Sequence, residues 1–378
     1  MGMQFRNFGK TGKKLSVLGF GAMRLPLIDK EDPSSIDFKK SIQMIRYAIE
    51  HGVNYIDTAY PYHNGMSEIF ISKVFENGYR QRANIADKLP CWKIDTYEDC
   101  DKFFNEQLQR LGVKEIDFYL LHALNKKSWN KVYNLGVLDW LEIQKKSGKI
   151  KFYGFSFHDE YPVYDLILNS FHWDFCQLQL NYLDTEYQQG IKGYLDAVKK
   201  GIGVIVMEPL KGGRLAKPKS PIKEMFEAEG KPRTPVQWAL DWVWDLPEVS
   251  MLLSGMSSLQ QVKQNIEYAQ IAKPNNMTKS EKDFIQKIEK SFNDLILVNC
   301  TDCKYCMPCP FGINIPLNFE MLNNTRFASV SLLKKQYLKV LTEEQRAKQC
   351  KQCGVCEEKC PQKIKIMTEL VLVSKTFK

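Results

Sequence analysis

The chain has 378 residues, of which 44% are hydrophobic and 26% charged, a balance typical of a globular protein. Its formal charge of +9 comes from lysines and arginines scattered along the sequence, so we expect no binding of nucleic acid. No apolar run approaches the ~20 residues of a membrane span, and the first residues lack the apolar core of a signal peptide. We therefore expect a cytoplasmic protein without membrane contact, long enough for a barrel and an appendage.

Short apolar segments alternate with amphipathic helical patterns through most of the chain. A turn-rich stretch at 5–18 predicts a small hairpin, and 17–21 predicts a first strand that ends in glycine. Seven more strands are predicted, at 55–57, 84–88, 117–122, 151–156, 175–180, 203–207 and 249–253. Helical patterns fall between them, as at 38–51, 97–111, 138–147, 190–200 and 235–244. Eight such units, ending near Ala269, favour a parallel sheet closed into a (β/α)8 TIM barrel.

An open doubly wound sheet is the alternative architecture. It would carry a glycine-rich phosphate loop after its first strand, but Gly19-Phe-Gly21-Ala-Met-Arg has no third glycine at the G-x-G-x-x-G spacing. Pro and Asn cluster at 273–276, so we predict a barrel domain at 1–275 and a mostly helical C-terminal domain at 276–378. In that domain a capped helix is expected from Thr278 to about 295, and a helical pattern recurs at 317–341.

Four polar side chains fall at the ends of three consecutive predicted strands: Asp57, Tyr62, Lys88 and His122. The carboxyl ends of barrel strands meet at one face, where the chemistry of such enzymes sits, so these four are expected to lie together. Taken alone, Asp57, Tyr62 and His122 are better explained as a turn cap, a packed ring and a structural histidine, whereas Lys88 is unusual because its charge needs a partner or solvent. The coincidence of all four favours a catalytic site.

These residue types suit the reduction of a carbonyl by hydride. An oxygen that gains negative charge needs a proton, and Tyr62 can give one if its pKa, ordinarily about 10, is lowered by a nearby ammonium. Asp57 would keep Lys88 charged and in position. A neutral His122 can donate a hydrogen bond to the carbonyl oxygen. Hydride itself must come from a nicotinamide, because no side chain supplies it.

Over about residues 5–269 the sequence resembles the aldo-keto reductase family. The landmarks are Phe8-Gly-Lys-Thr-Gly, Leu18-Gly-Phe-Gly-Ala-Met-Arg-Leu, Gly154-Phe-Ser-Phe, Gln177-Leu-Gln-Leu-Asn-Tyr and Glu208-Pro-Leu-Lys-Gly-Gly. The resemblance implies that Tyr62 is the general acid, that Lys88 and Asp57 tune it, and that His122 orients the carbonyl. It also suggests a substrate pocket lined by Met23, Arg24, His63 and Trp92.

The same resemblance implies a bound NADP or NAD. The nicotinamide end is expected at Ser156, Gln179 and Asn181, and Gly21 and Met23 are also expected to contact the cofactor. The loop over the pyrophosphate is expected at Pro209, Leu210, Gly212 and Leu215. The adenosine end is expected at Gly255, Met256, Ser257, Gln261, Gln264 and Asn265. Many members carry basic residues where Gln261 and Gly255 stand, which suits a 2′-phosphate. The choice between NADPH and NADH therefore stays open, with Lys211 and Lys263 as substitute cations.

Eight of the 11 cysteines lie between 300 and 360, in two similar groups. The first is Cys300-x2-Cys303-x2-Cys306-x2-Cys309-Pro, and the second is Cys350-x2-Cys353-x2-Cys356-x3-Cys360-Pro. The second has the bacterial ferredoxin spacing, in which three thiolates hold one cubane and the fourth reaches the other cluster. Zinc, the rival metal, usually takes two Cys-x2-Cys pairs. We predict two 4Fe–4S clusters, one on Cys300, Cys303, Cys306 and Cys360, the other on Cys350, Cys353, Cys356 and Cys309.

The sequence thus predicts an oxidoreductase that interconverts a small-molecule carbonyl and alcohol, fused to a ferredoxin-like module. The module either transfers electrons, with a redox partner protein as a candidate, or is structural. Hydride moves two electrons and each cluster moves one, and no flavin motif is visible to mediate between them. The alternative is an electron-transfer protein in which the clusters carry the function and the barrel is a docking scaffold.

Overall fold

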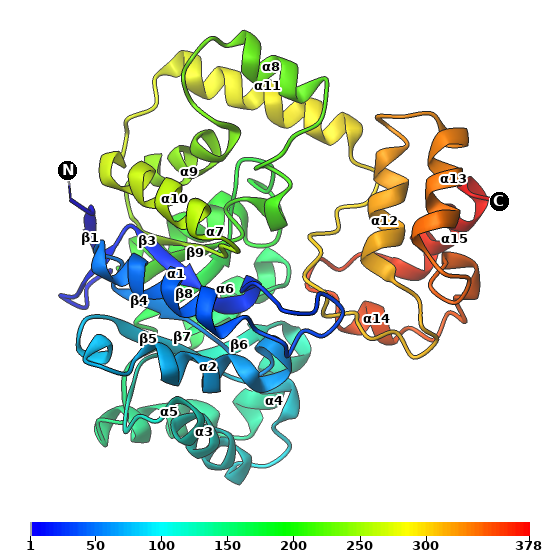
Figure 1. Cartoon of the computed structure of the whole chain (residues 1–378). Coiled ribbons are helices and arrows are strands. Elements are labelled where there is room, and N and C mark those ends of the chain that lie inside the picture. Colours follow the sequence, from blue (N-terminus) through cyan, green and yellow to red (C-terminus); the bar gives the residue numbers. More distant parts are fainter. Residues whose placement is uncertain (1) are drawn as a thin grey trace. The chain divides into compact units, whose positions relative to one another are not determined.

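The computed structural model describes residues 2–378, which fall into two compact units (Figure 1). The first runs to Pro209 and adds Ala239–Met277, and the second comprises Leu210–Trp238 and Thr278–Lys378. The loop after residue 209 therefore groups with the C-terminal part of the chain, and the domain boundary at 275/276 stays a prediction. Among the described residues, no helix has the length and apolar character needed to cross a membrane.

Eight parallel strands close into a barrel in the first unit, with the last strand paired to the first. In chain order they are β3 (Leu18–Gly21), β4 (Tyr55–Asp57), β5 (Asn84–Leu89), β6 (Ile116–Leu124), β7 (Ile150–Phe157), β8 (Phe175–Gln179), β9 (Gly203–Met207) and β10 (Val249–Ser254). The predicted (β/α)8 barrel is confirmed. The open sheet is excluded, because Leu252 of β10 lies beside Leu18 of β3.

Helices with apolar inner faces surround the strands (Figure 1). They are α1 (Phe38–Glu50), α2 (Met66–Val74), α3 (Glu98–Leu111), α4 (Lys126–Asn134), α5 (Val137–Lys146), α6 (Tyr161–Ser170), α7 (Gly190–Lys199), α9 (Pro235–Asp245) and α10 (Leu259–Ile271). Side-chain caps explain where several begin: Asp37 accepts a hydrogen bond from the Lys40 amide, and Ser258 accepts one from the Gln261 amide.

An N-terminal hairpin, β1 (Phe5–Asn7) and β2 (Lys14–Ser16), contributes Phe8 to the interior of the barrel. Phe8 is fully buried, with its ring centroid 5.2 Å from Phe118 and 5.3 Å from Phe175. A Cβ atom at Gly203, the first residue of β9, would lie 2.7 Å from the Phe8 ring, so this strand needs glycine there. The hairpin therefore fills the end of the barrel at which the strands begin.

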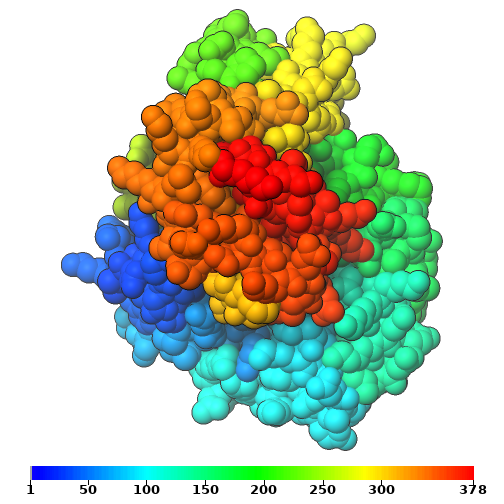
Figure 2. Space-filling view, turned by 90° about the vertical axis from the view of Figure 1, so that its right-hand side faces the viewer, coloured from blue at the N-terminus to red at the C-terminus, as the bar shows by residue number. Residues whose placement is uncertain are grey.

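The second unit contains α8 (Ile222–Ala228), α11 (Lys279–Leu295), α12 (Ile315–Asn324), α13 (Val330–Val340), α14 (Val355–Glu358) and α15 (Ile366–Thr376). α8 and α11 lie side by side (Figure 1), with the Phe226 and Phe284 rings 5.5 Å apart. α12 packs against α15 over a separate apolar core that includes Phe319, Leu322, Tyr337, Leu370, Val373 and Phe377. Figure 2 looks onto this helical body, where the red C-terminal segment lies against the orange one.

The helical pattern at 317–341 forms two helices with a break at 325–329. Asparagine side chains near the break bind backbone groups elsewhere: Asn323 accepts from the amides of Leu297 and Val298. Buried Asn318 accepts from the Tyr337 hydroxyl at 2.7 Å and the Ala347 amide at 2.9 Å. The two asparagines thus connect α12 to the segment at 297–298 and to α13. The helical periodicity of the sequence does not indicate such contacts.

We predict that Phe8→Ala lowers the free energy of unfolding of the barrel by about 3–5 kcal/mol, because it empties a fully buried ring site. Phe5→Ala on the same hairpin, where the ring is 48% exposed, should cost only about 0.5 kcal/mol. Urea unfolding followed by circular dichroism measures both. Equal effects of the two substitutions would show that Phe8 does not fill the barrel.

Candidate active site and cluster sites

Asp57, Tyr62, Lys88 and His122, the polar quartet, meet at the carboxyl ends of β4, β5 and β6. The Lys88 ammonium lies 2.7 Å from Asp57 Oδ1, 2.7 Å from the Thr58 carbonyl oxygen and 3.4 Å from the Tyr62 hydroxyl. The Tyr62 and His122 rings are 6.1 Å apart and nearly perpendicular. All four side chains are buried, and Lys88 has no exposed surface. The structure therefore brings together all four residues predicted from the strand ends.

Strand register and one tight turn place these groups. Asp57 ends β4 opposite Ala86, and Lys88 follows two residues later on the neighbouring strand, so both point to the same side of the sheet. Tyr62 begins a short helical turn, Tyr62–Gly65, in which His63 and Asn64 adopt positive φ. Both His63 ring nitrogens contact backbone carbonyls, at Pro33 and Ala22, which ties the turn to the preceding loop.

A buried polar layer outside the barrel wall holds the backbone at Lys88. Gln107 donates to the Lys88 carbonyl at 3.0 Å and to Glu68 at 3.1 Å, and Arg110 pairs with Glu68 at 2.8 Å. Asp87 accepts from the Lys88 amide at 2.8 Å, and burial, followed by the Glu68 charge, raises the Asp87 pKa well above its ordinary value. The strand that carries Lys88 is therefore held in place from outside the barrel.

Burial decides the protonation of the quartet's histidine. It lowers the His122 pKa well below its ordinary value, and the nearby Lys88 charge acts in the same direction. The imidazole is therefore neutral near pH 7 and carries one N–H. Its Nδ1 has no hydrogen-bond partner among the described residues. Trp92, 44% exposed, lies 5.1 Å from the His122 ring and forms a wall between it and solvent.

The residues expected at the nicotinamide end lie at neighbouring strand ends. The Ser156 hydroxyl accepts from the Ala123 amide at 2.7 Å. The side-chain NH₂ groups of Gln179 and Asn181 both donate to the buried carboxylate of Asp184, at 2.9 and 2.8 Å. Across the barrel, Gly21 ends β3 and Met23 lies in the turn after it.

The segment expected at the adenosine end follows β10. Asn265 donates to the Ser254 hydroxyl at 3.0 Å, and Met256 is buried. The Gln261 carboxamide oxygen accepts from the Ser257 amide at 2.8 Å. The side chain of Arg24 lies over Gly255, where a Cβ atom would sit 3.4 Å from three of its carbons. Gln264 lies on α10.

Two side chains at the strand ends were missed from the sequence. Gln177, on the same inward-facing side of β8 as Gln179, is 3% exposed, and its Oε1 has no partner among the described residues. The sequence did carry a signal for Gln177, because residues two apart on a strand face the same side and Gln179 was already a candidate. His158 directly follows β7, as His122 lies near the end of β6, and burial lowers its pKa to about 4. The side chain of Gln188 lies 3.3 Å from its ring.

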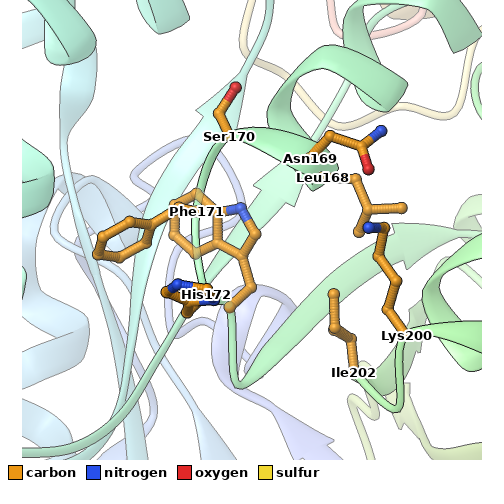
Figure 3. A pocket seen from close by; sticks show the side chains of 8 residues that line it. Leu168, Asn169, Ser170, Phe171, His172, Lys200 and Ile202 are labelled. Carbon is orange, nitrogen blue, oxygen red and sulfur yellow. The ribbon is translucent and has the colours of Figure 1, made fainter.

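An open pocket lies at the other end of the barrel. Its lining comes from the end of α6 and from the loops that precede β8 and β9 (Figure 3): Leu168, Asn169, Ser170, Phe171, His172, Trp173, Lys200 and Ile202. These residues stand where strands begin, whereas the polar quartet stands where they end. The pocket is therefore separate from the candidate active site.

The eight clustered cysteines line two small cavities. Cluster site A is lined by Cys300, Cys303, Cys306 and Cys360. Cluster site B is lined by Cys309, Cys350, Cys353 and Cys356. The fourth cysteine of each group thus joins the three of the other, the arrangement expected from the spacing. Cys353 is exposed, which places site B near the surface of its unit.

Four cysteines line each cavity, which suits a 4Fe–4S cluster. Four ligands of one zinc all lie about 2.3 Å from it. No set of three or more Cys, His, Asp or Glu side chains in the described part of the chain is arranged to hold one metal ion. A cubane presents four irons at separate corners, so its thiolates stand farther apart. Burial raises the pKa of Cys300 and Cys356 to about 11, so metal binding must displace protons.

Comparison with known proteins identifies the barrel. The sequence model described as "Aldo/keto reductase family" matches residues 17–286. The chain belongs to this family. A second model, "4Fe-4S dicluster domain", matches 299–364, which contains all eight clustered cysteines. The predicted fusion of an aldo-keto reductase barrel with a two-cluster module is confirmed, and with it the reading as an oxidoreductase.

Relatives and solved structures agree at the level of the barrel. L-galactose dehydrogenase of Arabidopsis thaliana is 28% identical over 287 residues, which cover 70% of this chain and 87% of the relative. The holo form of aldo-keto reductase AKR11C1 from Bacillus halodurans superimposes with a TM-score of 0.64 at 25% identity, covering 76% of this chain and 96% of that one. An aldo-keto reductase from Klebsiella pneumoniae in complex with NADPH has a TM-score of 0.61 at 20% identity over 76% of this chain and 96% of its own, which is a likeness of fold.

We predict that Lys88→Met destabilises the folded protein by about 3–5 kcal/mol, because it leaves the Asp57 carboxylate buried without its partner. Burial raises the Asp57 pKa above 3.8, so the folded state binds a proton that the unfolded state releases. The stability of this variant should therefore fall as pH rises above that value. Urea unfolding at several pH values tests this, and adding Asp57→Asn to Lys88→Met should restore stability and remove the pH dependence. A double variant no more stable than Lys88→Met would contradict the pairing.

For the cysteines we predict roughly eight irons per chain in protein purified without oxygen. Cys360→Ser should perturb the cluster held by Cys300, Cys303 and Cys306, whereas Cys309→Ser should perturb the other one. Iron analysis and electron paramagnetic resonance of the two variants distinguish these cases. Zinc in place of iron, or an effect of Cys360→Ser confined to site B, would refute the assignment.

Proposed function

We propose that the barrel reduces a small-molecule carbonyl, or oxidises the corresponding alcohol, with Tyr62 as the general acid or base. The observation that carries the proposal is the buried contact of the Tyr62 hydroxyl with the Lys88 ammonium, which Asp57 holds from its other side. A bound nicotinamide dinucleotide supplies or accepts the hydride. Its cofactor class follows from the family and the chemistry.

Each residue of the quartet then has one task in reduction. His122, neutral, donates a hydrogen bond to the substrate oxygen and fixes its direction. Tyr62 transfers its hydroxyl proton to that oxygen as negative charge develops on it. Lys88 stabilises the phenolate left on Tyr62, and Asp57 keeps the ammonium charged and aimed. In alcohol oxidation the phenolate takes the proton back. Because the quartet is buried, these charge interactions are stronger than they would be in water.

The side chains near the quartet fit a nicotinamide. Buried Gln177 Oε1 lacks a partner among the described residues and is the acceptor that a carboxamide NH₂ needs. Ser156, Gln179 and Asn181 are held at the adjoining strand ends, the last two by Asp184. At the adenosine end Gln261 is neutral and engaged with Ser257, so we propose no strong preference for NADPH over NADH.

The cysteine sites fit two 4Fe–4S clusters, as the dicluster match also indicates. Such clusters need reduced thiols, which supports a cytoplasmic location. The exposed Cys353 favours a one-electron carrier protein as a partner that reaches site B. A pure electron-transfer role for the whole chain is less well supported, because it would leave the buried quartet without a use.

We predict that Tyr62→Phe lowers kcat for carbonyl reduction by about 10²–10⁴, since the ring stays and only the proton donor is lost. The dissociation constants of NADPH and NADH should stay within about twofold of the wild type, because the phenol is not a cofactor contact in this proposal. Steady-state kinetics with a panel of carbonyl compounds, together with fluorescence titration of both dinucleotides, measures these values. Turnover close to wild type would refute the role of Tyr62.

A further inference from the structure

The loop that follows β9 packs, within the second unit, against the peptide that carries the first ligand of cluster site A. Arg214 of this loop donates from Nη2 to the Cys300 carbonyl oxygen at 2.8 Å and from Nη1 to Asn299 Oδ1 at 3.4 Å. The guanidinium thus binds the backbone carbonyl of a cluster cysteine with one donor and the side chain of the preceding residue with another. Iron bound at Cys300 would hold this backbone in place, so the hydrogen bond from Arg214 would be best ordered when the cluster is present.

The second contact of the loop is between backbones. Gly212 has φ of 66°, and a Cβ atom there would lie 2.2 Å from the carbonyl oxygen of Thr301, which is itself buried. The loop is also closed on itself, because the amides of Gly213 and Leu215 both donate to the Leu210 carbonyl oxygen, at 2.9 and 3.2 Å. Residues 210–215 therefore form one hydrogen-bonded turn that packs against Cys300 and Thr301.

This loop has a second task if the proposed function holds. It follows the seventh strand of the barrel, and in TIM barrels phosphate groups are commonly bound by the loops after strands seven and eight. A nicotinamide dinucleotide brings a pyrophosphate to such a position. Leu210, Gly212 and Leu215 would then face the cofactor, while Gly212 and Arg214 contact the peptide that carries Cys300.

We propose that occupation of cluster site A and binding of the nicotinamide dinucleotide are coupled through the loop 210–215, with Gly212 and Arg214 as the positioning residues. The proposal rests on the proposed function. An iron-loaded site A fixes Cys300 and Thr301, which keeps the loop in the shape that binds the dinucleotide. Because linkage is reciprocal, dinucleotide binding must stabilise the occupied site A by the same free energy. We expect the oxidised and reduced clusters to hold the loop to different extents, so that dinucleotide binding also shifts the reduction potential of this cluster. No electron needs to pass between hydride and cluster for this coupling to operate.

The sharpest test compares Gly212→Ala with Gly213→Ala in the iron-loaded protein. Both glycines have positive φ, 66° and 94°, so both substitutions strain the backbone. Only at Gly212 would the new methyl group meet Thr301, because nothing lies within 4 Å of a Cβ at Gly213. We expect Gly212→Ala to raise the dissociation constants of NADPH and NADH about tenfold or more, and Gly213→Ala to raise them less than about threefold.

A second pair of variants covers the case in which Gly212→Ala does not fold. Arg214→Gln removes the guanidinium from Cys300, whereas Lys217→Gln removes a positive charge from an exposed position nearby in the chain. Arg214→Gln should weaken dinucleotide binding and Lys217→Gln should not. A redox titration followed by electron paramagnetic resonance, with and without NADP⁺, measures the reduction potential of the cluster in site A. If Arg214 only stabilised the fold, dinucleotide binding would not change this potential. The site A potential should shift on dinucleotide binding in the wild type, and less in Arg214→Gln.

The outcomes separate the two proposals. If the wild type binds dinucleotide but each variant matches its control and the cluster potential does not respond, the coupling is refuted while the proposed function stands. If the wild type binds neither NADPH nor NADH, the proposed function fails and the coupling fails with it. A dinucleotide affinity that changes in Gly212→Ala and Arg214→Gln alone, with a potential shift in the wild type, supports the coupling.

Discussion

The buried ion pair between Lys88 and Asp57 is the constraint on which the active site depends. An ammonium without exposed surface is costly to place inside a protein unless hydrogen bonds and an opposite charge compensate it. Here it has a carboxylate, a carbonyl oxygen and a phenol around it. That arrangement stabilises a phenolate at Tyr62, because the ammonium that Asp57 holds in place also contacts the phenol oxygen.

The barrel explains why this pair forms at the right place. Adjacent parallel strands bring Asp57 and Lys88 to one side of the sheet, and the outer layer of Gln107, Glu68 and Arg110 fixes the strand that carries Lys88. The quartet therefore requires no movement of the backbone to assemble. Preorganisation of this kind is what electrostatic catalysis needs, because charges already in place cost no reorganisation during the reaction.

Much of this could be predicted from the sequence, for identifiable reasons. Strict alternation of short apolar runs with amphipathic segments indicates a parallel barrel, and Lys88 stands out because a charge at the end of an apolar strand needs a partner. The cysteine groups carry their own spacing code. Gln177 was missed because the sequence does not show whether a glutamine side chain on a strand has a hydrogen-bond partner. The break at 325–329 was also missed, and so were the hydrogen bonds that Asn323 accepts from the amides of Leu297 and Val298, because they join residues distant in sequence.

The contact of Arg214 and Gly212 with the peptide at Cys300 and Thr301 was beyond prediction from sequence, because it joins residues more than 80 positions apart without any pattern. It also bears on a difficulty raised by the fusion itself. Hydride transfer moves two electrons at once and a 4Fe–4S cluster moves one, so a direct electronic exchange would need a mediator that can do both. A mechanical link has no such requirement, because a free energy of coupling between two sites is independent of how many electrons either one handles. In our proposal the loop after β9 provides such a link through the hydrogen bond of Arg214 to Cys300 and the close contact of Gly212 with Thr301. Control of cofactor binding is then the simplest use of a cluster attached to this barrel.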